Sequence, residues 1–142
     1  MRFGNAQKFY EIDIPEGWVN SVSEDADVYF SADATVGILS VTAVVAKRGA
    51  VYDERRVDEM LKRFVLGQSP QKTEPPIRFD RPPQSGIRVD LRAKDRFVRA
   101  WFVWRGRLLH FITYNCHWSH RSIELDGVQA LVRDTFRVTR EI

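Results

Sequence analysis

Residues 87–115 read IRVDLRAKDRFVRAWFVWRGRLLHFITYN, and this stretch decides the fold. It contains three segments with the two-residue periodicity of β-strands, namely 87–93, 96–104 and 107–115. They are joined only by Lys94-Asp95 and Arg105-Gly106. Two-residue links of this kind are typical of tight hairpins, and Gly106 supplies the glycine that such loops favour. The stretch therefore predicts a three-stranded antiparallel meander.

The register of the predicted meander gives its strands two different faces. With two-residue loops, Asp90 lies opposite Arg99. Trp101 then lies between Arg88 and His110 on the neighbouring strands. One face is apolar and predicts a core: Ile87, Val89, Leu91, Val98, Ala100, Phe102, Trp104, Leu109 and Phe111. The other face is mixed, with charge on the first strand and apolar bulk on the last: Arg88, Asp90, Arg92, Phe97, Arg99, Trp101, Val103, Leu108, His110, Ile112 and Tyr114.

Two interpretations of this mixed face are open. In the first, a helix covers its apolar half, the arginines stay solvated, and Asp90 pairs with Arg99 across the strands. In the second, the face is exposed and receives a partner protein or closes a homodimer, because Tyr, Trp and Arg are enriched at the centres of interfaces. The second interpretation gives five candidate partner-binding residues: Arg88, Arg92, Arg99, Trp101 and His110.

The residues before the meander predict four more strands and a helix. Alternation predicts strands within 7–14, 18–22, 28–31 and 37–46, and both faces of the last are apolar or small, so we expect it to be covered on both sides. Residues 53–66 change to helical spacing, with Asp53 as the expected N-cap and Gly67 at the C-cap position. The connection 68–86 holds five of the six prolines and predicts only a short extended piece at Ile77–Phe79.

After the meander, apolar residues at helical spacing predict a second helix over about 122–136, capped by Ser119 or Ser122. Strands that pair antiparallel, together with two helices, predict an α+β fold in which an antiparallel sheet is flanked by helices as an α/β/α sandwich. A chain of 142 residues is also the usual size of one domain, so we expect a single domain over 1–142.

Composition narrows the classes of function. The chain has 22 basic and 19 acidic residues, a net charge of +3, which is too weak an excess to favour nucleic-acid binding. Its one cysteine, Cys116, excludes an intrachain disulfide and fits a reducing compartment, so we expect a cytoplasmic protein. Residues 1–7 lack the apolar core of a signal peptide, and no apolar run is long enough to span a membrane.

The segment 116–120, Cys-His-Trp-Ser-His, is the only cluster that resembles a chemical site. Cys116 and His120 are too few ligands for a tetrahedral metal centre, so no metal and no cofactor are expected. Cys116 beside His117 or His120 is a possible thiol nucleophile, although no orienting group or oxyanion hole can be named. Phosphate-binding loops and esterase elbows are absent from the sequence, so no catalytic residue is predicted.

Several short motifs fall at the expected element boundaries: Ile14-Pro15-Glu16-Gly17-Trp18, Phe30, Gly37, Thr42-Ala43, Ile112-Thr113-Tyr114-Asn115-Cys116 and Thr135-Phe136-Arg137. In this order they resemble the PsbP-like superfamily, which includes the Ran-binding Mog protein of eukaryotes and bacterial DcrB-like domains. The resemblance implies an antiparallel sheet between helices and a binding role without catalysis, toward GTPases, photosystem subunits or secretion effectors. The proline-rich middle and the lack of a DcrB-type lipoprotein signal depart from that pattern, and the resemblance transfers no functional residue.

These observations predict a noncatalytic protein-binding or adaptor domain. A bacterial secretion-effector chaperone or an immunity-type protein is one concrete form of this hypothesis. The alternative is a small-molecule-binding protein or a thiol-dependent enzyme that uses Cys116 with His117 and His120.

Overall fold

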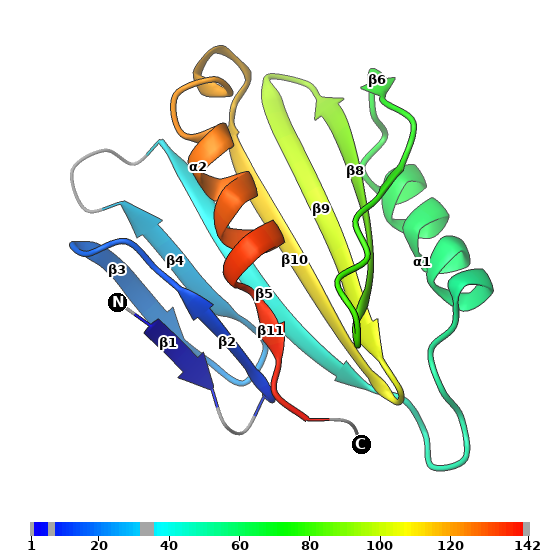
Figure 1. Cartoon of the computed structure of the whole chain (residues 1–142). Coiled ribbons are helices and arrows are strands. Elements are labelled where there is room, and N and C mark those ends of the chain that lie inside the picture. The colour runs from blue at the N-terminus through cyan, green and yellow to red at the C-terminus, as the bar shows by residue number, and fades with distance from the viewer. Residues whose placement is uncertain (1, 6–7, 32–35, 141–142) are drawn as a thin grey trace.

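The computed structural model describes residues 2–5, 8–31 and 36–140, and it shows a large antiparallel sheet with helices on its two faces (Figure 1). Residue 7, with which the first predicted strand begins, and residues 1 and 6 of the amino-terminal segment lie outside the described residues. Within the described residues, eight strands form the sheet in the order β3 (Trp18–Val22), β4 (Asp27–Ser31), β5 (Gly37–Val45), β10 (Leu108–His117), β9 (Arg96–Arg105), β8 (Ser85–Ala93) and β6 (Lys72–Thr73), while β7 (Ile77–Arg78) also pairs with β8.

The predicted meander is confirmed as β8, β9 and β10, with one change of register. Asp90 lies opposite Arg99 as expected, but Trp101 lies opposite Ile112 and not opposite His110. The reason is the second loop, which consists of residues 106 and 107. The primed turns that suit a two-residue loop need a positive φ at its first position, and Gly106 takes that position with φ 61°. Because the register moves by two residues, every side chain keeps its predicted face.

Helix α1 (Glu54–Gly67) covers the apolar face of the meander. Its predicted N-cap is confirmed, since the Asp53 carboxylate accepts a hydrogen bond from the Arg56 amide at 2.8 Å. Gly67 is the last helical residue and not the cap, because Gln68 keeps right-handed geometry and Ser69 turns the chain at φ 48°. The helix and the sheet share one buried apolar cluster: Ala46, Tyr52, Val57, Leu61, Val89, Ala100, Phe102, Trp104 and Leu109.

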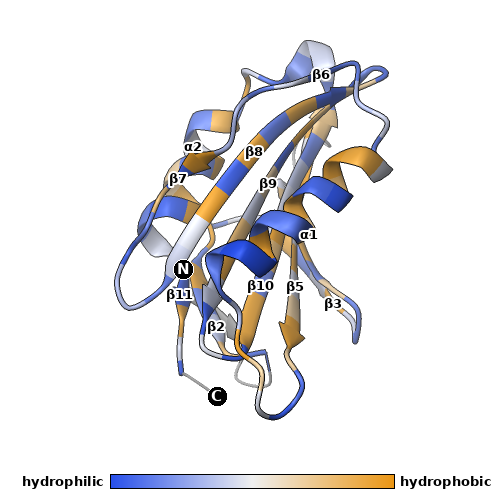
Figure 2. Ribbon diagram, turned by 90° about the vertical axis from the view of Figure 1, so that its right-hand side faces the viewer, coloured by the Kyte–Doolittle hydropathy of each residue, from blue (hydrophilic) through white to orange (hydrophobic). Residues whose placement is uncertain are grey.

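The opposite face is covered by the carboxyl-terminal helix and a small second sheet. Helix α2 (Leu125–Ala130) continues into a π-helical turn over Leu131–Thr135, and neither Ser119 nor Ser122 caps it, because the N-cap position is Glu124. Strands β1 (Arg2–Asn5), β2 (Tyr10–Asp13) and β11 (Arg137–Val138) form the small sheet in the order β1-β2-β11. Figure 2 shows α1 and α2 on opposite sides of the large sheet, which confirms the predicted α+β architecture.

Strand β5 corrects one expectation. Leu39 and Val41 are buried, but Ile38 is 50% exposed and Val44 is 38% exposed on the other face. The strand is therefore not covered on both sides. Helix α1 packs on β8, β9 and β10, and it lies at the β8 side of the sheet, away from β3 and β4 (Figure 1).

The proline-rich connection protects one edge of the sheet. Its short strands β6 and β7 pair with β8, and Ile77 belongs to the extended piece predicted there. A broken, proline-containing edge strand is a poor template for pairing with another chain. In the described ranges, the helices lack the length and apolarity that crossing a membrane would require.

Candidate functional site

The mixed face of the meander is mostly covered, as the first interpretation predicts, but that interpretation is wrong in leaving Arg99 solvated. Trp101 and His110 are 0% exposed and Arg99 is 7% exposed, because α2 and the small sheet lie over them. The expectation that these three residues form an exposed patch is therefore wrong. A homodimer remains a prediction, but Trp101 cannot form its contact surface in this fold.

Arg99 and Trp101 attach α2 to the sheet. The Arg99 guanidinium donates to both oxygens of Asp90, at 2.6 and 2.7 Å, which is the paired, charge-assisted geometry. A third Arg99 N–H and the Trp101 indole N–H both donate to the side-chain oxygen of Gln129 on α2, at 3.0 and 3.2 Å. Arg99 is thus held inside the protein and has a structural role.

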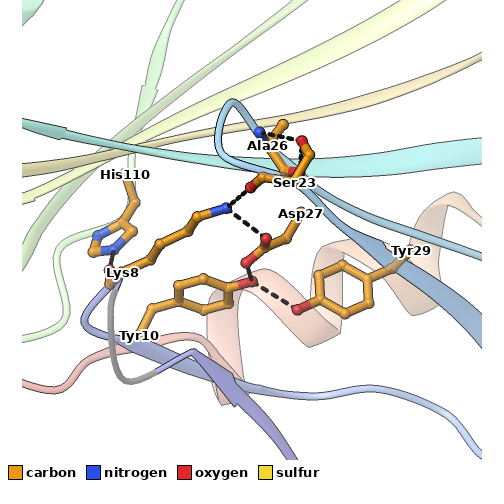
Figure 3. Close-up of polar contacts among 7 residues, drawn as sticks. All are labelled: Lys8, Tyr10, Ser23, Ala26, Asp27, Tyr29 and His110. Atoms are coloured by element: carbon orange, nitrogen blue, oxygen red, sulfur yellow. Dashed lines mark hydrogen bonds and ion pairs between the residues drawn. The ribbon is translucent and has the colours of Figure 1, made fainter.

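His110 lies in a second buried contact, between the large sheet and the amino-terminal hairpin (Figure 3). Its Nε2 is 2.6 Å from the Lys8 carbonyl oxygen, and its ring packs edge-on against Tyr10 and Phe136. Burial lowers the pKa of His110 to about 4, so the ring is neutral at pH 7 and Nε2 carries the donated proton. Its Nδ1 is buried and makes no hydrogen bond to the described residues.

A polar network that sequence reasoning missed surrounds this contact (Figure 3). The Asp27 carboxylate, which is 0% exposed, binds the Lys8 ammonium at 2.6 Å and accepts from the Tyr10 hydroxyl at 2.5 Å. The Tyr10 and Tyr29 hydroxyls are 2.6 Å apart, and burial together with Asp27 raises the pKa of Tyr10. The network joins β2 to β4, and its carboxylate and both tyrosines are buried.

Arg88 and Arg92 are the predicted residues that stay half-buried and accessible. Burial, reinforced by the charge of nearby Arg99, lowers the pKa of Arg88, whose side chain makes no hydrogen bond within the described part of the chain. Arg92 donates from Nε to the Lys94 carbonyl at 3.1 Å, and its guanidinium carbon is 4.5 Å from the centre of the Trp118 ring. Partner binding by Arg88 and Arg92 stays a prediction.

The second residue that flanks Trp118 is Arg121, which sequence reasoning did not single out. Its guanidinium carbon is 4.1 Å from the ring centre, and Nη1 donates to the Trp118 carbonyl at 2.8 Å. The Trp118 amide in turn donates to the Asp95 carbonyl of the β8–β9 loop, which fixes the turn over 118–120 beside the sheet. The available sequence signal was the position of a basic residue, Arg121, three residues after an aromatic residue, Trp118.

These side chains line a cavity of about 240 Å³ at the end of the sheet where the β8–β9 loop meets the turn after β10. We call it the Trp118 pocket; its lining residues are Lys72, Glu74, Asp90, Leu91, Arg92, Phe97, Trp118, Arg121, Ser122 and Leu125. Glu74 is paired with Lys72 at 3.2 Å, and Asp90 is paired with Arg99. Arg92 and Arg121 form no ion pair with a carboxylate of the described residues, so the pocket keeps uncompensated positive charge.

The segment 116–120 does not assemble the thiol site of the alternative hypothesis. Cys116 is 5% exposed, and burial raises the pKa of its thiol, which disfavours the reactive thiolate. His117 is the next residue of the same strand, so its side chain points to the opposite face. The His117 and His120 rings are 5.6 Å apart at the surface, and His117 Nδ1 pairs with the Ser119 hydroxyl.

A groove of about 460 Å³ passes the end of β10, where its lining includes Phe30, Ile38, Cys116 and His117. Among the described residues, no group of three or more His, Cys, Asp or Glu side chains is placed to hold a metal ion.

Comparison with known proteins identifies the fold of the chain but not a function. No protein-family model matches the chain, and a search of curated proteins found no match. Among solved structures, it is similar to the solution structure of cyanobacterial PsbP (CyanoP) from Synechocystis sp. PCC 6803, with a TM-score of 0.72, 14% identity, and coverage of 97% of this chain and 91% of that one. A crystal structure from Bacteroides thetaiotaomicron gives a TM-score of 0.58 at 12% identity over 99% of this chain, which spans 48% of that protein. The protein therefore has a PsbP-like fold.

Proposed function

With the PsbP-like fold as the premise, we propose that the protein is a noncatalytic protein-binding or adaptor domain. Its binding surface would be the accessible arginines beside α2, namely Arg88 and Arg92 with Arg121, and its partner would be a protein that presents an acidic segment. The observation that carries this proposal is the uncompensated pair Arg92 and Arg121 over Trp118 in an open pocket.

Three physical features support a protein partner. Arg and Trp are the residue types that contribute most to the centres of interfaces. Guanidinium groups bind carboxylates in paired hydrogen bonds that combine strength with geometry. The charge is local, since the chain as a whole carries only +3. A secretion-effector chaperone or an immunity-type protein in the cytoplasm is one form that such an adaptor would take.

Charge reversal at the surface arginines tests this function. Three proteins would be used as bait in an extract of native cells: wild type, Arg88→Glu/Arg92→Glu and a control. The control, Arg55→Glu/Arg63→Glu, changes exposed positions of α1. Any protein retained would then be purified and its affinity for each variant measured by calorimetry. We expect the partner to bind wild type and the α1 control and to lose binding to the first variant, while all three remain folded.

Equal binding to both double variants would contradict this surface as the site. Binding that is confined to nucleic acid, with affinity that falls steeply as salt rises, would contradict a protein partner.

The alternative function is a small-molecule-binding protein or thiol enzyme at the end of β10. The groove beside Cys116 and His117 is the observation that favours it. The raised pKa of Cys116 works against thiol chemistry at neutral pH. Replacing Cys116 with Ser separates the two functions, because an adaptor keeps its partner and a thiol enzyme loses turnover.

A further inference from the structure

The Trp118 pocket has two chemically different parts. One part is the pair of guanidinium groups of Arg92 and Arg121, both in contact with the Trp118 ring. The other part is apolar and includes Phe97, whose ring centre is 6.2 Å from that of Trp118, and Leu125 at the start of α2. A ligand that fills the pocket must therefore offer an anionic group and an apolar group side by side.

The two arginines are held in place while most of their donors stay free. Toward the residues that the structure describes, Arg92 donates only from Nε, to the Lys94 carbonyl, and Arg121 donates only from Nη1, to the Trp118 carbonyl. Arginine has five N–H donors, so each guanidinium retains donors for an added acceptor. Both side chains are half-buried and rest on an aromatic ring, which lowers the entropy lost when a ligand fixes them.

The acidic residues of the pocket restrict the ligand further. Glu74 and Asp90 line the same cavity, and each is already neutralised by a basic partner. A single carboxylate that binds Arg92 and Arg121 adds one negative charge near these acidic residues, whereas a run of phosphates along a nucleic acid would add several. A volume of about 240 Å³ is sufficient for one large side chain.

We propose that the Trp118 pocket binds a segment of a partner protein in which an Asp or Glu lies next to a large aliphatic or aromatic residue. The carboxylate accepts hydrogen bonds from Arg92 and Arg121, and the apolar side chain packs against Phe97 and Leu125. This inference rests on the adaptor function proposed above and names the sequence feature that its partner presents.

Fluorescence polarisation with labelled octapeptides tests the proposal. The probes are Gly/Ser peptides that carry Glu-Leu or Leu-Glu at their centre, with Gln-Leu and Glu-Ser as matched controls and a single-stranded oligonucleotide as the competing class. We expect saturable binding of at least one Glu/Leu peptide and an affinity at least about tenfold weaker for each control. Gln-Leu loses a charged hydrogen bond and Glu-Ser loses the burial of the leucine side chain, and each loss is worth roughly that factor. Arg92→Gln and Arg121→Gln should each weaken the peptide about tenfold.

The matched control variant is Arg63→Gln, which removes the same charge from an exposed position of α1 on the other face of the sheet. It should bind the peptide as wild type does. Three outcomes overturn the proposal: Gln-Leu binds as tightly as Glu-Leu, the Arg63 variant weakens binding as much as the pocket variants, or the oligonucleotide binds and the peptides do not.

The two proposals fail in distinguishable ways. If a purified partner is lost by Arg88→Glu/Arg92→Glu but is unaffected by Arg121→Gln, the adaptor function stands and the pocket inference is overturned. If no partner distinguishes the arginine variants from their α1 control, both proposals fall together.

Discussion

Acid should destabilise this protein through His110. The ring is buried between Tyr10 and Phe136, and its Nε2 bonds the Lys8 carbonyl. A second proton would have to be placed on Nδ1, which has no hydrogen-bond partner among the described residues. The folded protein therefore resists protonation, whereas the unfolded chain accepts the proton readily.

The size of the effect follows from the two pKa values of His110. Burial lowers the pKa from 6.5 to about 4, and each unit of difference corresponds to about 1.4 kcal/mol. Because the unfolded state binds the proton at higher pH, the contribution is fully present above pH ~6.5 and is lost as the pH falls toward ~4. The complete loss is about 3 kcal/mol, of which about 2 kcal/mol falls between pH 7.5 and pH 5.

Urea unfolding, followed by tryptophan fluorescence at several values between pH 7.5 and pH 5, measures this loss. The informative quantity is the difference between wild type and His110→Gln, because other titrating groups contribute equally to both. We expect wild type to lose about 2 kcal/mol more than His110→Gln over this range. The control His120→Gln removes an exposed histidine and should keep the wild-type pH dependence. Parallel profiles for wild type and His110→Gln would refute the reasoning.

Three further substitutions test packing, capping and the buried network by the free energy of unfolding. Gly37→Ala should cost about 1–3 kcal/mol, because its Cβ would overlap the hydroxyl and ring of the buried Tyr114, and an unchanged midpoint would contradict that close contact. Asp53→Ala should cost about 1 kcal/mol through loss of the α1 cap, with Asp53→Asn retaining most of the stability. Asp27→Asn should cost about 3–5 kcal/mol, because it leaves the Lys8 ammonium without its partner, and a loss below ~1 kcal/mol would show that water replaces the contact.

The meander could be predicted because its signals are local. Alternation over residues 87–115 assigned each side chain to a face, and the cap at Asp53 lies within a few residues of the helix that it starts. The exact position of the β9–β10 loop required one further argument. The first residue of such a loop needs a positive φ, which favours Gly106 over Arg105 as that first residue. Local conformational preferences of this kind can be worked out from a short window of sequence.

The sequence left two alternatives for the coverage of the mixed face and predicted the coverage of β5 wrongly, because coverage depends on where distant elements pack. The alternation on β5 is the same whether or not a helix lies above Ile38, and α1 happens to lie over β8, β9 and β10. The network around Asp27 joins residues about twenty positions apart that share no motif. Tyr29 lies two positions after Asp27 on β4, but nothing near Asp27 in the sequence indicates that Lys8 and Tyr10 bind its carboxylate.

Arg92 and Arg99 show how this limit affects the assignment of a binding site. The two residues share a face of the meander and look equivalent in sequence. Arg99 lies opposite Asp90 and under Gln129, so its guanidinium is paired with a carboxylate inside the protein. Arg92 lies opposite Phe97, which offers no carboxylate, and its guanidinium lies over Trp118 in the pocket.

A charge reversal at Arg99 would therefore destabilise α2 and abolish binding without revealing the site. The same reversal at Arg92 leaves the attachment of α2 intact, so a loss of binding there reports on the surface itself. At 14% identity the PsbP-like fold determines where the sheet and its covering helices lie but not which arginines remain free. Under the function proposed above, we expect partner specificity to depend on Arg88, Arg92 and Arg121 beside Trp118, which the packing of α2 leaves accessible.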